Sequence, residues 1–347
     1  MMEEKLYNFT IDLNWKLINQ LSQIDRFDAS WTALEKREKR SLRDLKSFAT
    51  IQSVGASTRI EGSKMNNDQV KALIQNIKIS SVKSRDAQEV AGYFNVLEII
   101  TDSPNDMSIS KSMIKNLHNQ LLKVSEKDSW HKGEYKQHSN AVEANFPDGS
   151  KQIIFRTTAP GFATEDAMDS LIKWYHDESE THHLIKIAVF VYEFLSIHPF
   201  QDGNGRLSRL LTTLLLLKNN YVWVQYISFE HEIENRKRQY YNALRSCQAQ
   251  RPGENISEWV TFFLTSLLNI QIKLDKKLEI KTSSVNLAPR DKSIYLFISL
   301  NPGCKSSEIS TQLSIPNPTT KRILGQMLED ELIKKFGKGA GVNYAVK

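Results

Sequence analysis

Two strongly apolar segments joined by a short glycine-rich loop constrain the fold of this 347-residue chain most strongly. The first runs from Leu184 to Ile197 and must end before Pro199, because a residue that precedes proline is pushed out of the helical region. The loop Asp202-Gly203-Asn204-Gly205 follows, and its glycines allow positive φ angles and a close approach of other groups to the backbone. A second apolar helix is predicted from Arg206 to Asn219. The pattern predicts a buried helix–loop–helix.

Helical periodicity also covers most of the remaining chain. The other helices that we predict span residues 32–60, 67–77, 87–100, 110–122, 165–176, 233–247 and 256–278. Around residues 133–160 the pattern differs, because Val142, Ala144 and Phe146 alternate, residues 147–150 have turn chemistry and residues 152–155 are apolar. That pattern is typical of a β-hairpin. We therefore expect a mostly α fold with one small hairpin.

Composition excludes several classes of protein. A hydrophobic content of 40% is enough for a packed core, and a charged fraction of 25% argues against disorder. The two cysteines, Cys247 and Cys304, form neither a disulfide framework nor a zinc motif. The longest apolar run is too short to cross a bilayer, and the N-terminus does not resemble a secretory signal. We expect a soluble, cytoplasmic protein without a membrane partner.

The net charge of +6 is concentrated at the C-terminal end. Residues 281–347 hold ten Lys and Arg against five Asp and Glu, so this stretch carries +5. Its pattern of three helices and a hairpin looks like a winged helix-turn-helix, in which Thr319, Thr320, Lys321 and Arg322 would begin the third helix and meet DNA. The alternative, equally open, is that this domain docks a target protein or another subunit, such as a second copy of the chain, since the acidic residues 329–331 dilute its charge.

The glycine loop has the chemistry of an anion site. Its free N–H groups and the positive end of the following helix attract phosphate. Arg206 and Arg209 share one face of that helix in its first turn, where a bound polyphosphate would offset their unfavourable interaction with the helix dipole. Asp202 offers a hard oxygen for Mg²⁺, and His198 can take a proton from a hydroxyl. Together these parts predict nucleotide-dependent group transfer onto a hydroxyl.

These residues resemble a known family. The stretch from His198 to Arg209 reads HPFQDGNGRLSR and is similar at every fixed position to the Fic motif. The likeness covers roughly residues 5–275. It implies a protein adenylyltransferase that moves AMP from ATP to a Ser, Thr or Tyr hydroxyl of a target protein. By resemblance, His198 is the general base and Asp202 the Mg²⁺ ligand. The residues Gly203, Asn204, Gly205 and Arg206 hold the α- and β-phosphates, and Arg209 reaches the γ-phosphate.

A second motif lies upstream. The residues from Ser57 to Gly62 read STRIEG and look like the Fic inhibitory motif. Ser57 and Glu61 lie four residues apart on one helix face, and Glu61 is at the helix C-terminus, where its charge needs water or a cation. In the family this glutamate pairs with the second arginine of the main motif, here Arg209, and blocks the γ-phosphate position. A second possibility is that Glu61 positions a water that removes AMP.

The family also suggests roles for the hairpin and for two tyrosines. The predicted hairpin corresponds to the family flap, which aligns the target chain by adding a strand to it. The usual double proline after the flap is absent here, so its individual contacts are left open. Tyr240 and Tyr241 fall where family members hold adenine, but a helix can equally bury one of them in the core.

The combined interpretation has three domains: an N-terminal helical region with the inhibitory helix over residues 1–108, a Fic catalytic core over residues 109–280 and a winged helix over residues 281–347. ATP and Mg²⁺ are the implied substrate and cofactor. The competing hypotheses are a DNA-binding regulator whose Fic core only senses a nucleotide, and AMP removal or another phosphoester transfer on the same core. An intact His198 favours the enzyme, because a sensor needs no base.

Overall fold

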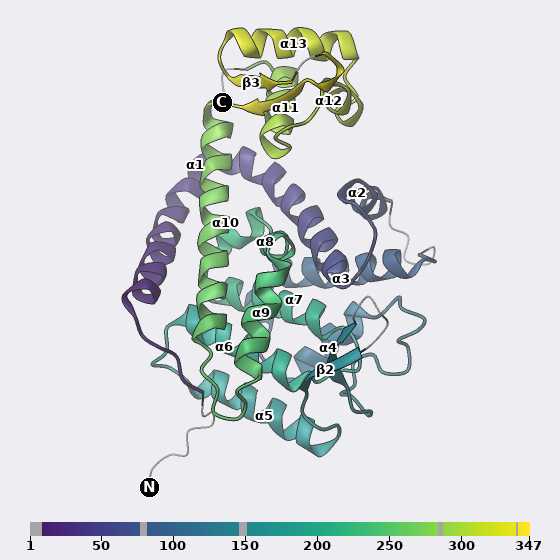
Figure 1. The fold of residues 1–347 in the computed structure, drawn as a ribbon, viewed down its shortest axis with the longest axis vertical. Coiled ribbons are helices and arrows are strands. Elements are labelled where there is room, and N and C mark those ends of the chain that lie inside the picture. The colour runs from purple at the N-terminus through teal and green to yellow at the C-terminus, as the bar shows by residue number, and fades with distance from the viewer. Residues whose placement is uncertain (1–8, 77–81, 146–150, 284–286, 338) are drawn as a thin grey trace. The chain divides into compact units, whose positions relative to one another are not determined.

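The computed structural model describes residues 9–76, 82–145, 151–283, 287–337 and 339–347. The chain divides into two compact units, Met1–Gln271 and Ile272–Lys347 (Figure 1). The fold is mostly helical, as predicted. The elements of the first unit, with α10 continuing into the second, are α1 (Trp15–Ile60), α2 (Asn67–Gln75), α3 (Arg85–Asp102), η2 (Pro104–Asp106), α4 (Lys111–Leu121), β1 (Ala141–Asn145), β2 (Lys151–Arg156), α5 (Phe162–Asp177), α6 (His183–Ile197), α7 (Asn204–Lys218), η3 (Val222–Tyr226), α8 (Phe229–Asn235), α9 (Lys237–Gln248) and α10 (Ser257–Ser283).

The two apolar segments of the sequence form the centre of the first unit. From Leu184 onward α6 buries every residue except Lys186, and α7 buries every residue except Gly205 and Lys218. A helix that is buried all round must be surrounded by other helices, and α7 packs against α6, α3, α4 and α1. The loop between α6 and α7 is therefore attached at both ends to the best-packed part of the unit.

Helix α1 begins much earlier than predicted. The sequence indicated a helix over residues 32–60, whereas the structure begins it at Trp15, with Asn14 as the N-cap whose side chain accepts from the Leu17 N–H. The missed half buries Leu17, Ile24 and Trp31, which are seven residues apart and share one face. Trp15 is 80% exposed. Apolar residues such as this one lie outside the buried face, and they obscured the helical periodicity of the sequence.

Two other boundaries differ from the prediction. The helix expected over residues 233–247 is divided at Arg236 into α8 and α9. The break lies within a run of polar residues. Helix α10, predicted to end at residue 278, continues through Ser283. Ser110 caps α4, and its hydroxyl accepts from the Met113 N–H.

The predicted hairpin is present. Strands β1 and β2 pair antiparallel, with Ala141 opposite Arg156 and Asn145 opposite Lys151, and the register shifts between Val142 and Glu143. The predicted strand residue Phe146 and the predicted turn over residues 147–150 lie outside the described residues.

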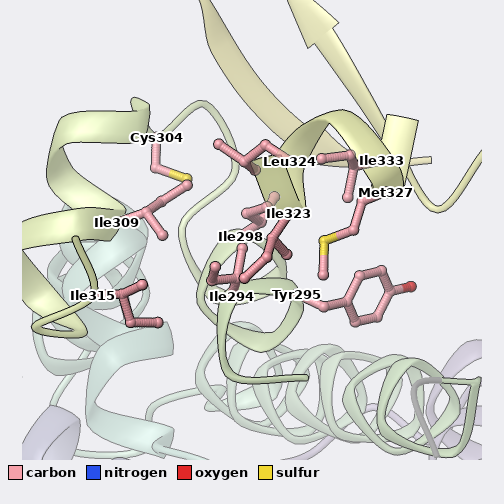
Figure 2. Close-up of a cluster of buried hydrophobic side chains, with 10 residues drawn as sticks. All are labelled: Ile294, Tyr295, Ile298, Cys304, Ile309, Ile315, Ile323, Leu324, Met327 and Ile333. Atoms are coloured by element: carbon pink, nitrogen blue, oxygen red, sulfur yellow. The ribbon is translucent and has the colours of Figure 1, made fainter. Parts of the chain in front are cut away.

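The second unit has the predicted order of three helices and a hairpin: α11 (Pro289–Leu300), α12 (Ser306–Gln312), α13 (Asn317–Glu329), β3 (Ile333–Phe336), η5 (Gly339–Gly341) and β4 (Asn343–Val346). Its core gathers ten buried side chains from all three helices, from β3 and from the connecting loops at Cys304 and Ile315 (Figure 2). Lys321 and Arg322 are exposed on α13, but Thr320 is fully buried, and its hydroxyl donates to the Ile315 carbonyl at 3.4 Å. The expectation that Thr320 meets DNA is therefore wrong. Contact with DNA or a protein through the other residues stays a prediction, as does the winged-helix assignment.

Candidate active site

The loop between α6 and α7 is shaped by its own side chains. His198 ends α6 in the left-handed region, with φ 52° and ψ 60°. The side chain of Asn204 closes the loop: its Oδ1 accepts from the Phe200 N–H at 2.9 Å and its Nδ2 donates to the Phe200 carbonyl at 2.7 Å. Gly203 precedes α7 with φ 81°, a conformation that favours glycine. The predicted phosphate ligand Asn204 thus has its side-chain groups engaged with the loop itself.

A histidine that sequence reasoning missed supports the loop from behind. His118 on α4 is fully buried, its Nε2 lies 3.0 Å from the Asp202 carbonyl, and its Nδ1 accepts from the Gly133 N–H at 2.9 Å. Its ring stacks on Phe200 with 3.8 Å between centroids. Burial lowers the pKa of His118 to about 4, so the ring is neutral with its proton on Nε2. A lone histidine on an amphipathic helix carries no sequence signal for this role.

This neutral histidine should make the stability of the protein depend on pH. The pKa of His118 is about 4 in the folded protein and 6.5 in the unfolded chain. The contribution of this neutral histidine to the free energy of unfolding is therefore complete above pH 6.5 and is lost as the pH falls towards 4. At pH 5 the loss should be about 2 kcal/mol. The measurement is urea unfolding at pH 7 and pH 5, with His118→Gln, which keeps a donor and an acceptor, as the control. An equal loss in both proteins would contradict the assignment.

Arg206 has free donors beside the loop. Only 2% of this residue is exposed, and its Nη2 lies 3.4 Å from Asp202 Oδ1 while its Nη1 lies 3.8 Å from Glu89 Oε1. Within the described part of the chain, Nε and Nη1 have no hydrogen-bond partner. Unpaired buried donors on a cation are costly, and a phosphate oxygen would satisfy them. The side chain therefore fits the predicted role as a phosphate ligand.

Asp202 is the carboxylate of the loop. Its side chain is 39% exposed, and its Oδ1 accepts from the Gly203 N–H at 2.6 Å and from Arg206. Burial raises the pKa of this carboxyl, but Arg206 and the Gly203 N–H lower it more, so the net shift is downward and the group is ionised at neutral pH. Both hydrogen bonds fall on Oδ1, which leaves Oδ2 for another ligand.

Magnesium fits this arrangement only together with phosphates. Among the residues that the structure describes, no group of three or more His, Cys, Asp or Glu side chains could hold a metal ion. Mg²⁺ is commonly bound through one or two carboxylates plus substrate phosphates, with water completing its shell. The partly exposed, ionised Asp202 next to an anion-binding loop offers one such carboxylate.

Glu61 and Ser57 both engage Arg209, and the family resemblance implied the contact with Glu61. The Arg209 Nη2 donates to Glu61 Oε1 at 2.8 Å and to the Ser57 carbonyl at 3.0 Å, and its Nε donates to Ser57 Oγ at 2.8 Å. Arg209 is 2% exposed, and the side chain of Glu61 is 33% exposed. Burial lowers the pKa of Arg209, but Glu61 and the neighbouring Tyr93, Tyr240 and Tyr241 together raise it more, so the guanidinium stays charged.

Gly205 allows this pairing. A Cβ at position 205 would lie 2.3 Å from Glu61 Oε1 and 3.3 Å from Arg209 Nη1, which is closer than real contacts permit. The glycine thus lets the glutamate reach across the first turn of α7. Gly62, the last residue of the predicted inhibitory motif, follows the end of α1 with φ 107°, where glycine is favoured.

The end of α1 that carries Glu61 is held in place by α8 and α9. Arg59 makes two hydrogen bonds to the carboxylate of Glu234, at 2.6 and 3.0 Å. Lys237 donates to the Ile60 carbonyl at 2.6 Å and so satisfies a free carbonyl at the helix end. A bidentate arginine pair fixes direction as well as distance. Glu61 is therefore presented to Arg209 by an anchored helix end.

His198 is neutral at physiological pH. Burial lowers its pKa to about 4, and the positive charge of Lys136 adds to this effect. The Leu195 carbonyl accepts from the ring and acts in the opposite direction. A ring that donates from one nitrogen presents the lone pair of the other, so the imidazole can act as a base.

The two tyrosines have different environments. Tyr240 is 4% exposed and packs against Trp259 and Phe262 at 5.5 and 5.8 Å between centroids, and burial raises its pKa to about 12. Tyr241 is partly exposed, with Arg245 5.3 Å from its ring centroid. Tyr240 therefore has the packing of a core residue, whereas Tyr241 is only partly buried.

The comparisons with known proteins agree with this geometry. Residues 108–216 match the model of the Fic/DOC family. This stretch is therefore similar to Fic domains. The chain is 29% identical over 185 residues to the protein adenylyltransferase Fic of Drosophila melanogaster, and 27% identical over 206 residues to that of Drosophila willistoni. These matches cover 52% and 58% of this chain but only 35% and 39% of the relatives.

Solved structures share the fold. A Fic family protein from Desulfovibrio desulfuricans G20 matches with a TM-score of 0.64 and 21% identity, covering 98% of both chains. A Fic domain containing signalling protein from Bacteroides thetaiotaomicron matches with a TM-score of 0.57 and 24% identity, covering 74% of this chain and 94% of that one. The residues matched by the family model include the loop from His198 to Arg209, whereas Glu61, Tyr240 and Tyr241 lie outside residues 108–216.

Across the described ranges, none of the helices combines the length and apolar character that a membrane crossing requires.

Proposed function

We propose that this protein transfers AMP from ATP to a hydroxyl side chain of a target protein, and that Glu61 restrains the reaction. The observation that carries the proposal is the neutral His198 at one end of a loop whose other end presents Arg206 and Arg209. The names of the Drosophila relatives support the same activity.

The roles of the residues follow from this geometry. The hydroxyl oxygen of the target attacks the α-phosphorus of ATP, and the bond from that phosphorus to the bridging oxygen breaks, so pyrophosphate leaves. His198 takes the hydroxyl proton. The N–H groups at the start of α7 and the free donors of Arg206 hold the phosphates. Arg209 holds the γ-phosphate when its guanidinium is not paired with Glu61.

Asp202 is the proposed ligand for Mg²⁺. A bound Mg²⁺ supplies charge neutralisation on the phosphates of the leaving group. The protein's own part is to keep the Asp202 carboxylate ionised and aimed by the Gly203 N–H and Arg206. The target is proposed to lie along β1 and β2, and the residue modified to be Ser, Thr or Tyr.

Label transfer tests the proposal against its alternatives. We expect purified protein incubated with Mg²⁺ and ATP to become labelled from the α-phosphate and not from the γ-phosphate. Label from the γ-phosphate alone would show a kinase, and no label in a variant freed from Glu61 would favour a regulator that only senses the nucleotide. Mass spectrometry of the labelled protein identifies the class of hydroxyl.

A further inference from the structure

The residue Lys136, which none of the motifs includes, is tied to both neighbours of His198. Its side chain is almost completely buried, with 1% of the residue exposed, and its Nζ donates to the Ile197 carbonyl at 3.0 Å. Its backbone N–H donates to the Pro199 carbonyl at 2.8 Å. The carbonyls before and after His198 are thus held by one residue.

His198 needs such support because of its backbone conformation. Its φ of 52° lies in the left-handed region, which a residue other than glycine occupies only at an energetic cost. A conformation of this kind persists only where the surrounding structure enforces it. Hydrogen bonds to the carbonyls of Ile197 and Pro199 restrain the peptide groups on both sides of this residue.

The same ammonium group also reaches the hairpin. Its other two donors bind Asn140 Oδ1 and Thr157 Oγ1, both at 2.9 Å. Asn140 directly precedes β1 and Thr157 directly follows β2. The Thr157 hydroxyl donates to the Asn140 carbonyl at 2.7 Å, and Asn140 Nδ2 donates to the Phe200 carbonyl at 2.9 Å. All three donors of Lys136 are therefore used, and they join the catalytic loop to both ends of the hairpin.

We propose that Lys136 is a positioning residue that holds His198 in place for proton transfer and couples it to the roots of the β1–β2 hairpin. The inference rests on the proposed AMP transfer, in which the hairpin aligns the target and His198 receives its proton. The lysine fixes the base relative to the element that presents the hydroxyl, so one buried side chain sets the geometry between them.

The test compares Lys136→Met with Lys186→Met in a Glu61→Gly parent. Methionine keeps an unbranched side chain of nearly the same length and removes the ammonium group. Lys186 lies near the start of α6, and its Nζ donates to the Glu178 carbonyl. It provides a matched control because His198 lies at the other end of this helix. We expect Lys136→Met to lower kcat at least about tenfold with KM for ATP within about twofold, because the phosphate donors are untouched. A kcat within twofold of the parent would overturn the proposal.

A second readout does not depend on activity. The positive charge of Lys136 contributes to the low pKa of His198, so an NMR titration of labelled histidine should show that pKa rising in Lys136→Met and not in Lys186→Met. If the parent itself transfers no label, the proposed AMP transfer fails, but this titration still tests whether Lys136 acts on His198. An unchanged pKa of His198 in Lys136→Met would refute the positioning role of Lys136.

A milder variant keeps the inference testable if Lys136→Met does not fold. Thr157→Val preserves the lysine and the shape of the side chain but removes the hydroxyl that links both hairpin ends. We expect kcat to fall about threefold to tenfold without a change in KM for ATP, because the hydrogen bonds of this hydroxyl to Lys136 and Asn140 are lost while Lys136 keeps its other two. Parent-like kcat in Thr157→Val would contradict the coupling to the hairpin.

Discussion

Replacing Glu61 with glycine is expected to raise the rate of AMP transfer about tenfold to a hundredfold, because a hydrogen bond between charged groups contributes about 1.5–3 kcal/mol. The substitution removes the carboxylate that takes the Arg209 Nη2 at 2.8 Å. Arg209 keeps its two hydrogen bonds to Ser57, so its direction is retained while Nη2 gains a free position for the γ-phosphate. The measurement is the initial rate of labelling from α-labelled ATP.

Glu61→Gln is the matched control for this result. The amide oxygen can still accept from Arg209 but without the negative charge, so we expect a smaller rise than with glycine. Glu61 lies at the end of α1, where glycine is tolerated, and thermal unfolding should show both variants folded. An unchanged or lower rate in a folded Glu61→Gly variant would contradict inhibition by this residue.

The same substitution also tests whether Glu61 supports AMP removal. If the carboxylate positions a water, protein modified beforehand should lose AMP in the wild type and keep it in Glu61→Gly. The rate of loss, measured without free ATP, separates this activity from inhibition of transfer. Equal loss in both proteins would exclude a role for Glu61 in removal.

The second large effect is expected at His198. His198→Ala should lower AMP transfer by about a hundredfold to ten-thousandfold, the usual contribution of a general base. Burial holds the pKa of this histidine near 4, so at pH 7 it is already deprotonated and its loss removes a functioning base. Transfer in the parent should be independent of this group above about pH 5 and should fall as the pH approaches 4.

His183→Ala is the control for His198→Ala. His183 is exposed at the other end of the same helix, so its removal should leave the rate unchanged. The variants should be compared in the Glu61→Gly protein, and ATP binding should be measured by calorimetry to show that His198→Ala still holds the nucleotide. Retained transfer in a folded His198→Ala protein would refute its role as base.

Local sequence was enough to predict the elements of the site. The Pro199 helix stop, the glycines at 203 and 205 and the apolar helices on either side are short-range features, because each acts on residues within one or two turns. The structure has the loop between α6 and α7 where these features predicted it. The pairing of Glu61 with Arg209 was predicted from the family resemblance, since nothing local links residues that far apart.

What the sequence by itself determined is a mostly helical chain with a buried helix–loop–helix, a hairpin and the residues of an anion site. Only the tertiary structure decided which distant side chains support that site. His118 meets Asp202 from 84 positions away, and Lys136 meets Ile197 from 61 positions away. The sequence around His118 or Lys136 shows no pattern that predicts its role. That role comes from burial and from hydrogen bonds to backbone carbonyls, which every residue has whatever its side chain. The packing of α4 and of the segment before β1 against the loop creates these contacts.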